Sequence, residues 1–335
     1  MMNKMKTAFV TGGAGFLGLN LIDQLVAENW CVVAMDLKTS TLERFKKSGV
    51  QVVVGDITDL ASCKQALPKN TDAVFHLAGN TSHWKLGDKR QSQVNVDGTR
   101  HMVQAALSNK ARRLIYTSSI AAFGFQPGRI TEKMKSSALH SKINYFRTKR
   151  LAELEVHEGI KKGLDAVIVN PANIIGPYDD YGWARFFYMI DKEKLPGVPP
   201  GRASFCGARQ VAAAHVAAYE KGRCGNNYLL GGADATFKEL VEQIGGLLNR
   251  KVPEHATPAV LLKIIGRLSH WISYVTRKEP DLTPEKALLV SSELICSSEK
   301  AERELGYEPA PLPFTLKECF DWLMEEGLLI RSHTQ

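Results

Sequence analysis

A tyrosine and a lysine four positions apart are the residues of this 335-residue chain whose types and spacing best suit proton transfer. On a helix, Tyr145 and Lys149 share one face and lie about 6 Å apart along the axis. A phenol ionises at about pH 10, so holding it as a phenolate at neutral pH needs about 4 kcal/mol of selective stabilisation. A neighbouring ammonium group provides part of that stabilisation. The pair alone is equally typical of an exposed helix, so its surroundings must decide.

Hydroxyl side chains stand where they can join this pair. Thr117, Ser118 and Ser119 follow a short apolar run and precede the tyrosine. In doubly wound sheets, the carboxyl ends of the strands line the ligand crevice. We therefore expect Ser119, or alternatively Ser118, to hydrogen-bond the same substrate oxygen as Tyr145.

A glycine-rich turn at residues 11–18, Thr-Gly-Gly-Ala-Gly-Phe-Leu-Gly, separates a β-rich run from a helical pattern. Glycines there allow a tight turn and close approach of a pyrophosphate, which the helix N-terminus binds. Asp36 ends the second apolar run, where a carboxylate accepts both ribose hydroxyls of NAD and repels the 2′-phosphate of NADP. The sequence predicts NAD as the cofactor. NADP remains an alternative, because Lys38 and Arg44 follow closely.

The elements that must position these residues alternate regularly. Short apolar runs separated by helical patterns occupy residues 6–11, 31–35, 50–54, 73–77, 113–117 and 166–170. Such runs indicate strands that are buried on both faces of a mostly parallel sheet. Because crossovers between parallel strands are right-handed, we predict an α/β fold with a doubly wound, Rossmann-type parallel sheet.

The second half of the chain has a different texture. Loops and proline-rich joints follow Pro171, and residues 227–230 can return one strand to the sheet. We expect residues 1–172 to form a nucleotide-binding domain, to which the chain returns around 206–232. A smaller, mainly helical, substrate-binding domain would comprise residues 173–205 and 233–330.

Taken in order, these motifs resemble the extended short-chain dehydrogenase/reductases, the NAD-dependent epimerase/dehydratase superfamily. The resemblance spans nearly the whole chain. Besides the turn, Asp36, the serines and the Tyr-Lys pair, it rests on residues 55–59, 76–79, 95–99, 170–171 and 176–177.

The resemblance implies a role for each motif. Tyr145 would be the general acid/base, Lys149 would bind the nicotinamide ribose and lower the pKa of the tyrosine, and Ser119 would orient the substrate oxygen. Asn95 would support a relay or make a structural hydrogen bond. The implied cofactor contacts are Gly12, Gly15, Phe16, Leu17, Gly18, Asp36, Asp56, Ile57, Ala78, Gly79, Asn95, Tyr145, Lys149, Pro171 and Ile174.

The residues that follow Thr117 differ between enzymes of this family that catalyse different reactions. Dehydratases of the family carry an Asp-Glu pair after the threonine, where this chain has Ser118 and Ser119. Residues 116–124, 297–301 and 305–307 look like those of 3β-hydroxysteroid dehydrogenases and dihydroflavonol reductases. The resemblance therefore implies an oxidoreductase that transfers a hydride between nicotinamide and an alcohol or ketone on a hydrophobic or ring-bearing substrate.

Two other interpretations stay open. A sugar-nucleotide epimerase shares the Ser, Tyr and Lys but needs donors for a diphosphate. A catalytically silent, nucleotide-sensing protein of the same fold would be marked by loss of the Tyr or Lys, and both are present. Aromatic residues can line an apolar substrate pocket or fill the core: Trp84, Phe123, Phe125, Trp183, Phe186, Phe187, Tyr188 and Phe205. We expect His76 to be structural and assign no role to His83.

Composition bounds the remaining possibilities. Hydrophobic residues make up 44% and charged residues 23%, as in ordinary globular proteins. The six cysteines are scattered without a Cys-x-x-Cys pair, which predicts no metal site and a reducing compartment, the cytoplasm. The net charge of +8 suits anionic ligands or an ordinary basic surface. No basic helix or basic aromatic patch suggests nucleic-acid binding.

Residues 259–275 form the longest apolar stretch. Lys263, Arg267 and His270 interrupt it, so it falls short of the about 20 apolar residues that span a membrane. An amphipathic helix on a membrane surface is one interpretation, and a helix packed on its own domain is the more ordinary one. The resemblance also implies a homodimer through the helices near 95–108 and 145–159.

Overall fold

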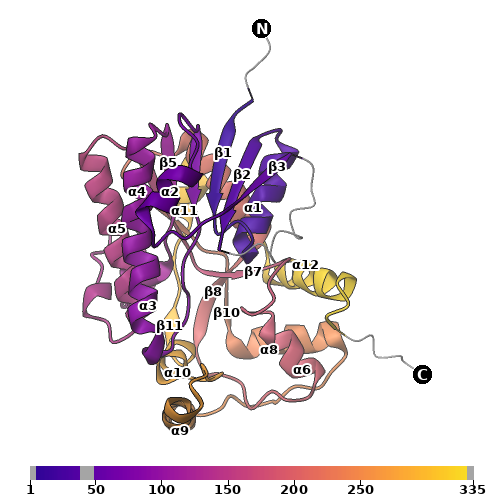
Figure 1. Cartoon of the computed structure of the whole chain (residues 1–335). Coiled ribbons are helices and arrows are strands. Elements are labelled where there is room, and N and C mark those ends of the chain that lie inside the picture. Colours follow the sequence, from indigo (N-terminus) through magenta and orange to yellow (C-terminus); the bar gives the residue numbers. More distant parts are fainter. Residues whose placement is uncertain (1–4, 38–48, 330–335) are drawn as a thin grey trace.

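A seven-stranded parallel sheet forms the centre of the protein, in a computed structural model that describes residues 5–37 and 49–329 (Figure 1). The strand order is β3-β2-β1-β4-β5-β6-β9. The strands are β1 (Thr7–Thr11), β2 (Cys31–Asp36), β3 (Val50–Val54), β4 (Ala73–His76), β5 (Arg113–Thr117), β6 (Ala166–Pro171) and β9 (Asn227–Leu230). The order reverses between β1 and β4, which opens a ligand crevice at their carboxyl ends. The predicted doubly wound α/β fold is confirmed.

Helices cover both faces of this sheet because successive strand residues point to opposite sides. In β1, Ala8 and Val10 join the core on one face, and Phe9 joins the core on the other. The first face carries α1 (Phe16–Ala27), α7 (Ala208–Lys221) and α11 (Glu299–Leu305). The second face carries α2 (Leu60–Ala66), α4 (Gly98–Ser108) and α5 (Asn144–Lys161).

A second, smaller sheet lies beyond the crevice. Its central strand β8 (Arg202–Gly207) pairs in parallel with β7 (Asn173–Ile175) and β11 (Glu293–Leu294), and antiparallel with β10 (Ala233–Thr236). The helices α6 (Arg185–Asp191), α8 (Phe237–Leu248) and α12 (Leu312–Glu325) share one core with it. The sequence predicted this part as mainly helical. The small sheet was missed because β7 and β11 have only three and two residues, and the six residues of β8, Arg-Ala-Ser-Phe-Cys-Gly, do not form a continuous apolar run.

The division between the two parts is less simple than predicted. Residues 233–330 were all expected in the substrate-binding domain, yet Ala301 and Leu305 of α11 pack in the core under the seven-stranded sheet. Tyr307 follows them, and its hydroxyl donates to the carbonyl of Gly231 at 2.6 Å. The chain thus returns to the first part at α11 as well as at α7 and β9.

Shorter elements complete the description. They are α3 (Asp88–Ser92), the π-helical turn Gln93–Asp97, the 3₁₀ turns Lys85–Gly87, Ile120–Phe123 and Ala138–His140, and the helices α9 (Ala259–Thr276) and α10 (Pro284–Val290). Within residues 5–37 and 49–329, no helix combines the length and apolarity that crossing a bilayer would require.

Candidate active site

The glycine-rich turn is built so that backbone, not side chains, faces the crevice. Gly12 has a φ of +67°, and a Cβ there would lie 2.8 Å from the backbone nitrogen of Ala78. A Cβ at Gly18 would lie 2.2 Å from the carbonyl oxygen of Gly12. Gly15 is the N-cap of α1, in an extended conformation that opens the helix N-terminus. The turn between Thr11 and Phe16 therefore suits close approach of a pyrophosphate.

Asp36 lies directly beside this turn. Its carboxylate accepts hydrogen bonds from the backbone amides of Ala14, at 3.0 Å, and Leu37, at 2.7 Å. This position at the end of β2 is the one from which a carboxylate reaches ribose hydroxyls. Lys38 and Arg44, which were expected to soften the rejection of NADP, lie outside the described residues.

Two of the expected cofactor contacts, Asp56 and Ile57, follow β3. Asp56 accepts from the backbone amide and the hydroxyl of Thr58, both at 2.8 Å, and pairs with Arg90 at 3.3 Å. Burial raises the pKa of Asp56, but the bonds from Thr58 and Arg90 outweigh it and hold this pKa below its usual value. Ile57 is buried and packs on Gly98, where a Cβ would lie 2.7 Å from the isoleucine Cδ1.

Helix α5 brings Tyr145 and Lys149 together at the carboxyl end of β5. The Lys149 Nζ lies 6.0 Å from the centroid of the Tyr145 ring and donates to the carbonyl of Thr117 at 2.9 Å. The Ser119 side chain lies close enough to the Tyr145 phenol to lower the pKa of that phenol. The three residues whose chemistry was inferred from the sequence therefore meet at one place.

The geometry separates the two candidate serines. Ser118 is buried and donates to the Oε1 of Glu153 at 2.7 Å. Ser119 instead turns to Tyr145, and its Oγ also accepts from the amide of Ala121 at 3.2 Å. Only Ser119 is placed to share a substrate oxygen with the phenol.

Burial dominates the protonation of the pair. It raises the pKa of Tyr145 to about 12, although the hydrogen bond with Ser119 opposes the shift. It lowers the pKa of Lys149 to about 8, against the attraction of Glu153. The resemblance implied that Lys149 lowers the pKa of the phenol. In this protein without cofactor, the removal of the phenol from water has the larger effect and raises its pKa. Tyr145 is consequently a neutral proton donor at neutral pH.

Asn95 fixes the loop that borders the lysine. Its Oδ1 accepts from the Asn80 amide at 2.7 Å, and its Nδ2 donates to the Asn80 carbonyl at 3.0 Å and to the Thr148 hydroxyl at 3.1 Å. A Cβ at Gly79 would lie 3.5 Å from the Nζ of Lys149. These contacts favour a structural hydrogen-bonding role for Asn95 over a relay.

Glu153 is a buried carboxylate that the sequence analysis missed. It accepts from Ser118 and from Asn170, both at 2.7 Å, from Asn227 at 3.1 Å and from Arg150 at 2.8 Å. It thereby ties the carboxyl ends of β5 and β6 to the first residue of β9. The signal was present, because Glu153 continues the i+4 spacing of Tyr145 and Lys149 on the same helix face.

The expected contacts after β6 divide between the two sheets. Pro171 ends β6 beside Ser119, whose carbonyl accepts from Asn170 at 3.1 Å. Ile174 has already left for the small sheet, where it pairs with Cys206 in β8.

Two histidines lie near the site. His76 is buried between the hydroxyls of Thr11, at 2.7 Å, and Thr99, at 3.1 Å, in keeping with the structural role expected for it. His83, for which no role was expected, packs on the Tyr145 ring with 5.3 Å between centroids. The backbone of Thr81 hydrogen-bonds its ring, while its buried Nε2 has no partner among the described residues.

Most of the aromatic residues expected around the substrate belong to the core instead. Trp183, Phe186 and Phe205 pack against Phe237, and Phe187 is fully buried. Phe123 is also buried, and Phe125 packs on Phe146 with 5.1 Å between centroids. Of the two expected roles, lining a pocket or filling the core, these residues have the second. The extra sheet explains it, because its inner face needs large side chains to fill the space under α6 and α8.

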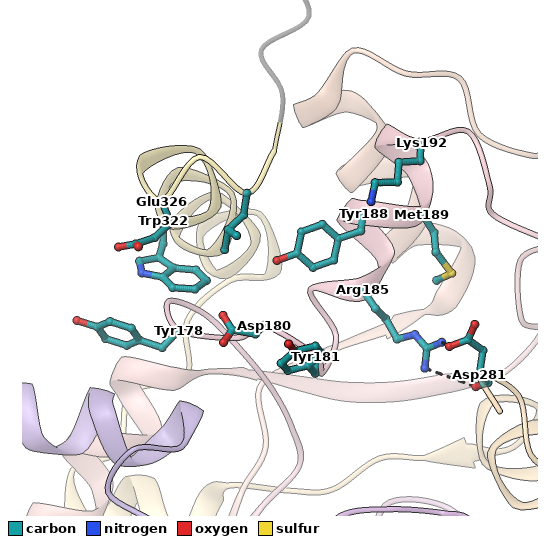
Figure 2. Close-up of a pocket in the computed structure, with 11 residues that line it drawn as sticks. Tyr178, Asp180, Tyr181, Arg185, Tyr188, Met189, Lys192, Asp281, Trp322 and Glu326 are labelled. Carbon is teal, nitrogen blue, oxygen red and sulfur yellow. Dashed lines mark hydrogen bonds and ion pairs between the residues drawn. The ribbon is translucent and has the colours of Figure 1, made fainter. Parts of the chain in front are cut away.

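A separate pocket of about 1010 Å³ lies between α6, α12 and the loop after β7 (Figure 2). The rings of Tyr178 and Trp322 lie 5.5 Å apart at one side, and Arg185 pairs with Asp281 at 2.9 Å on the other. Of the expected aromatic residues, Tyr188 lines this pocket. Neither Ser119, Tyr145 nor Lys149 is among its lining residues.

No cluster of three or more His, Cys, Asp or Glu side chains suited to a metal ion occurs in the described part of the chain.

Comparison with known proteins identifies the family to which this chain belongs. The model of the NAD dependent epimerase/dehydratase family matches residues 8–231. The sterol demethylase protein B of Methylococcus capsulatus is 30% identical over 329 residues, which cover 96% of this chain and 100% of that protein. The putative dihydroflavonol 4-reductase of Synechocystis is 25% identical, with 95% of each chain covered.

Solved structures give the same picture of the fold. The crystal structure of gox2253 has a TM-score of 0.84 and 27% identity, covering 97% of this chain and 100% of that one. The Bordetella bronchiseptica enzyme WbmH in complex with NAD+ has a TM-score of 0.76 and 23% identity, with 97% of this chain and 100% of that one covered.

Proposed function

Because this chain belongs to the NAD-dependent epimerase/dehydratase family, we propose that it is an oxidoreductase acting on an alcohol or ketone of a hydrophobic, ring-bearing substrate. One observation carries the proposal. The hydroxyls of Ser119 and Tyr145 meet beside Lys149, at the end of the crevice that begins at the glycine-rich turn. That arrangement suits proton transfer to one substrate oxygen.

When bound, the nicotinamide cofactor supplies or accepts the hydride. The backbone of the Gly12–Gly18 turn would hold its pyrophosphate, Asp36 its adenosine ribose, and Lys149 its nicotinamide ribose. In the reducing direction, Tyr145 donates its proton to the carbonyl oxygen as the carbonyl carbon gains the hydride. Ser119 orients that oxygen, and the Lys149 ammonium stabilises the phenolate that remains.

The substrate class is inferred from several features together. Ser118 and Ser119 replace the Asp-Glu pair that a dehydratase of the resembled type would carry. Two relatives are named for a sterol and for a dihydroflavonol, which are ring-bearing molecules. His83 adds an unpartnered nitrogen beside Tyr145, suited to receive a hydrogen bond from a substrate hydroxyl.

A sugar-nucleotide epimerase is the second candidate, since the same serine, tyrosine and lysine would serve it. Its diphosphate would need a basic clamp in the second part of the protein. The pocket in Figure 2 contains Arg185 and Lys192, but Asp180, Asp281 and Glu326 oppose them. Three acidic residues against two basic ones suit a diphosphate poorly, so this pocket gives the epimerase interpretation no support.

The finer assignments are also proposals. NAD is preferred to NADP because Asp36 faces the turn. A homodimer would form through α4 and α5, and α5 exposes Leu151 and Leu154 on one side. A cytoplasmic, reducing location suits the six free cysteines.

The direct experiment purifies the protein, measures the bound cofactor, and follows NADH oxidation with a panel of cyclic ketones that includes a 3-ketosteroid and a flavanone-type ketone. Turnover with a cyclic ketone, slowed by about 10²–10⁴-fold in the Tyr145→Phe variant, is the expected result. NAD that stays bound through purification, together with no net turnover of any ketone and interconversion of a UDP-sugar, would identify an epimerase instead.

A further inference from the structure

Helix α9 is packed the opposite way from an ordinary surface helix. The side that it turns toward the protein carries Leu262, Gly266 and Ser273, the residues of α9 that are buried. Its large apolar side chains point outward instead: Leu268 is 60% exposed, Trp271 71% and Val275 87%. A globular protein normally buries such residues and exposes the small polar ones, so this face has a function that the isolated chain does not satisfy.

The exposed apolar side chains form one continuous face. At about 100° per residue, they fall within an arc of about 140°, centred nearly opposite the buried residues. The members of this outer face are Val260, Leu261, Ile264, Ile265, Leu268, Trp271, Ile272 and Val275. Figure 1 shows α9 at one end of the molecule, with α10 between it and the rest of the second part. The face is therefore free to meet a flat surface.

Close packing on α10 fixes this orientation. A Cβ at Gly266 would lie 3.1 Å from the carbonyl oxygen of Thr283, just before α10 begins. Nearer the C-terminus of the helix, Ser273 accepts a hydrogen bond from the Trp84 Nε1 at 3.0 Å. These contacts keep α9 from rolling its apolar face inward.

The charged residues around the outer face indicate which kind of surface it binds. Lys263 and Arg267 border the apolar arc on one side, and Arg277 and Lys278 follow the helix. Residues 255–278 contain no Asp or Glu. Within the described residues, none of these four cations forms an ion pair, although many basic residues elsewhere do. An apolar face with Trp, bordered by unpaired Lys and Arg, is complementary to a bilayer surface that contains anionic lipids.

We propose that α9 is an in-plane anchor that binds the protein to the surface of a membrane containing anionic lipids. The outer face would enter the boundary between headgroups and acyl chains, and the four cations would contact lipid phosphates.

A second copy of the chain fits this face less well. A helix of 18 residues offers a strip about 27 Å long and about 10 Å wide, small beside the about 800 Å² per subunit of a stable interface. Symmetric pairing of two such helices would also bring their Lys263 and Arg267 side chains together without a compensating acid. A bilayer needs no matching partner surface and provides the negative charge.

The anchor is joined to the loop beside the proton donor. Besides the Trp84–Ser273 bond, the Ser82 hydroxyl donates to Glu279 at 2.8 Å, just beyond α9. His83 lies between Ser82 and Trp84 in the sequence, and its ring packs on Tyr145. An anchored α9 would thus hold this side of the active site toward the membrane, where an apolar substrate is dissolved. This last consequence rests on the proposed function, but the binding itself does not.

The test is co-sedimentation of the full-length protein with vesicles of phosphatidylcholine, alone or mixed with phosphatidylglycerol. Binding to the mixed vesicles, weakened by added salt, is expected. The double variant Leu268→Ser/Trp271→Ser changes only exposed positions and should bind at least about tenfold more weakly. Lys263→Gln/Arg267→Gln should remove the preference for the anionic lipid. The matched control is Phe314→Ser/Tyr181→Ser, which removes exposed aromatic side chains elsewhere and should bind like the wild type.

Retention of NADH binding checks that each variant is folded. Wild-type protein that stays in solution with both vesicle types would overturn the proposal, as would equal binding by the Leu268→Ser/Trp271→Ser variant. A dimer that this variant converts to a monomer, in a protein that ignores vesicles, would assign the face to a second copy. Because vesicle binding is measured without turnover, the outcome is independent of the proposed reaction.

Discussion

The imidazole of His83 lies against the phenol ring of Tyr145, with 5.3 Å between the two ring centroids. Burial lowers the pKa of His83 to about 4, so its ring is neutral when the phenol is ready to donate a proton. Its Nε2 is then an acceptor without a partner among the described residues. A hydrogen-bond acceptor on a ring that packs against the proton donor is suited to select the substrate.

Replacing His83 by Phe should therefore lower kcat/KM by about tenfold for a substrate that carries a second hydroxyl, because one hydrogen bond is lost. Packing against Tyr145 is kept, and the Kd for NADH should be unchanged. His83→Gln restores an acceptor and should recover part of the activity. Equal kcat/KM values for wild type and His83→Phe across such substrates would limit the histidine to packing.

Asp36 should decide the choice of cofactor. Asp36→Ala removes the carboxylate that faces the turn, so it should weaken NADH binding and narrow the difference between NADH and NADPH. Titration of intrinsic fluorescence with each cofactor measures both dissociation constants. Tighter binding of NADPH than of NADH by the wild type would mean that Lys38 or Arg44, the basic residues that follow Asp36 in the sequence, outweigh the carboxylate.

Acid should destabilise the protein through its buried histidines. Burial lowers the pKa of His76 to about 3, and that of His83 and His215 to about 4, from the ordinary value of 6.5. Below pH 6.5, these histidines bind protons in the unfolded chain but stay neutral in the folded protein. Stability that is present above pH 6.5 is therefore lost as the pH falls toward about 4.

Urea denaturation at a series of pH values across this window measures the effect. His215→Gln should flatten the dependence of the unfolding free energy on pH, and replacement of the exposed His255 is the matched control. A stability that is constant between pH 6.5 and about pH 4 would refute the contribution of the buried histidines.

Replacement of Lys149 and replacement of Ser119 should affect cofactor binding and turnover differently. Lys149→Ala removes both a ribose contact and the cation that stabilises the phenolate, so cofactor binding and turnover should fall together. Ser119→Ala loses one orienting hydrogen bond and should reduce kcat less than Tyr145→Phe does. The Ser119→Ala/Tyr145→Phe double variant should be non-additive, because both groups meet one oxygen. Ser118→Ala is the control for Ser119, since Ser118 bonds Glu153 instead. A larger loss from Ser118→Ala than from Ser119→Ala would reverse the assignment.

Much of the fold was readable in the sequence because parallel strands buried on both faces carry continuous apolar runs. The run at 73–77, for example, became the wholly buried β4. The small sheet could not be predicted, since β11 has two residues, β7 has three, and the six-residue β8 mixes polar residues with apolar ones. The aromatic residues near 183–187 were consequently taken as pocket candidates, although they fill the space between this sheet and its helices.

The site was predictable where a motif fixes local geometry and unreadable where contacts come from distant segments. The i+4 spacing predicted that Tyr145 and Lys149 share a helix face, as they do. Choosing Ser119 over Ser118 required the position of Glu153, and linking His83 to Tyr145 required the path of the loop before α3. Likewise, the apolar pattern of 259–275 fits a packed helix or an exposed one equally well. Only the position of α10 decides which face of α9 is turned outward.

The central claim is that Tyr145 gives the proton that accompanies hydride transfer. The most direct measurement is the single-turnover rate of NADH oxidation with a cyclic ketone by wild type and Tyr145→Phe, together with the Kd for NADH. A positioned acid contributes about 10²–10⁴-fold to the rate, so the variant should be slower by that factor, with cofactor binding nearly intact. A Tyr145→Phe protein that transfers hydride at the wild-type rate would contradict the account, because another group would then supply the proton.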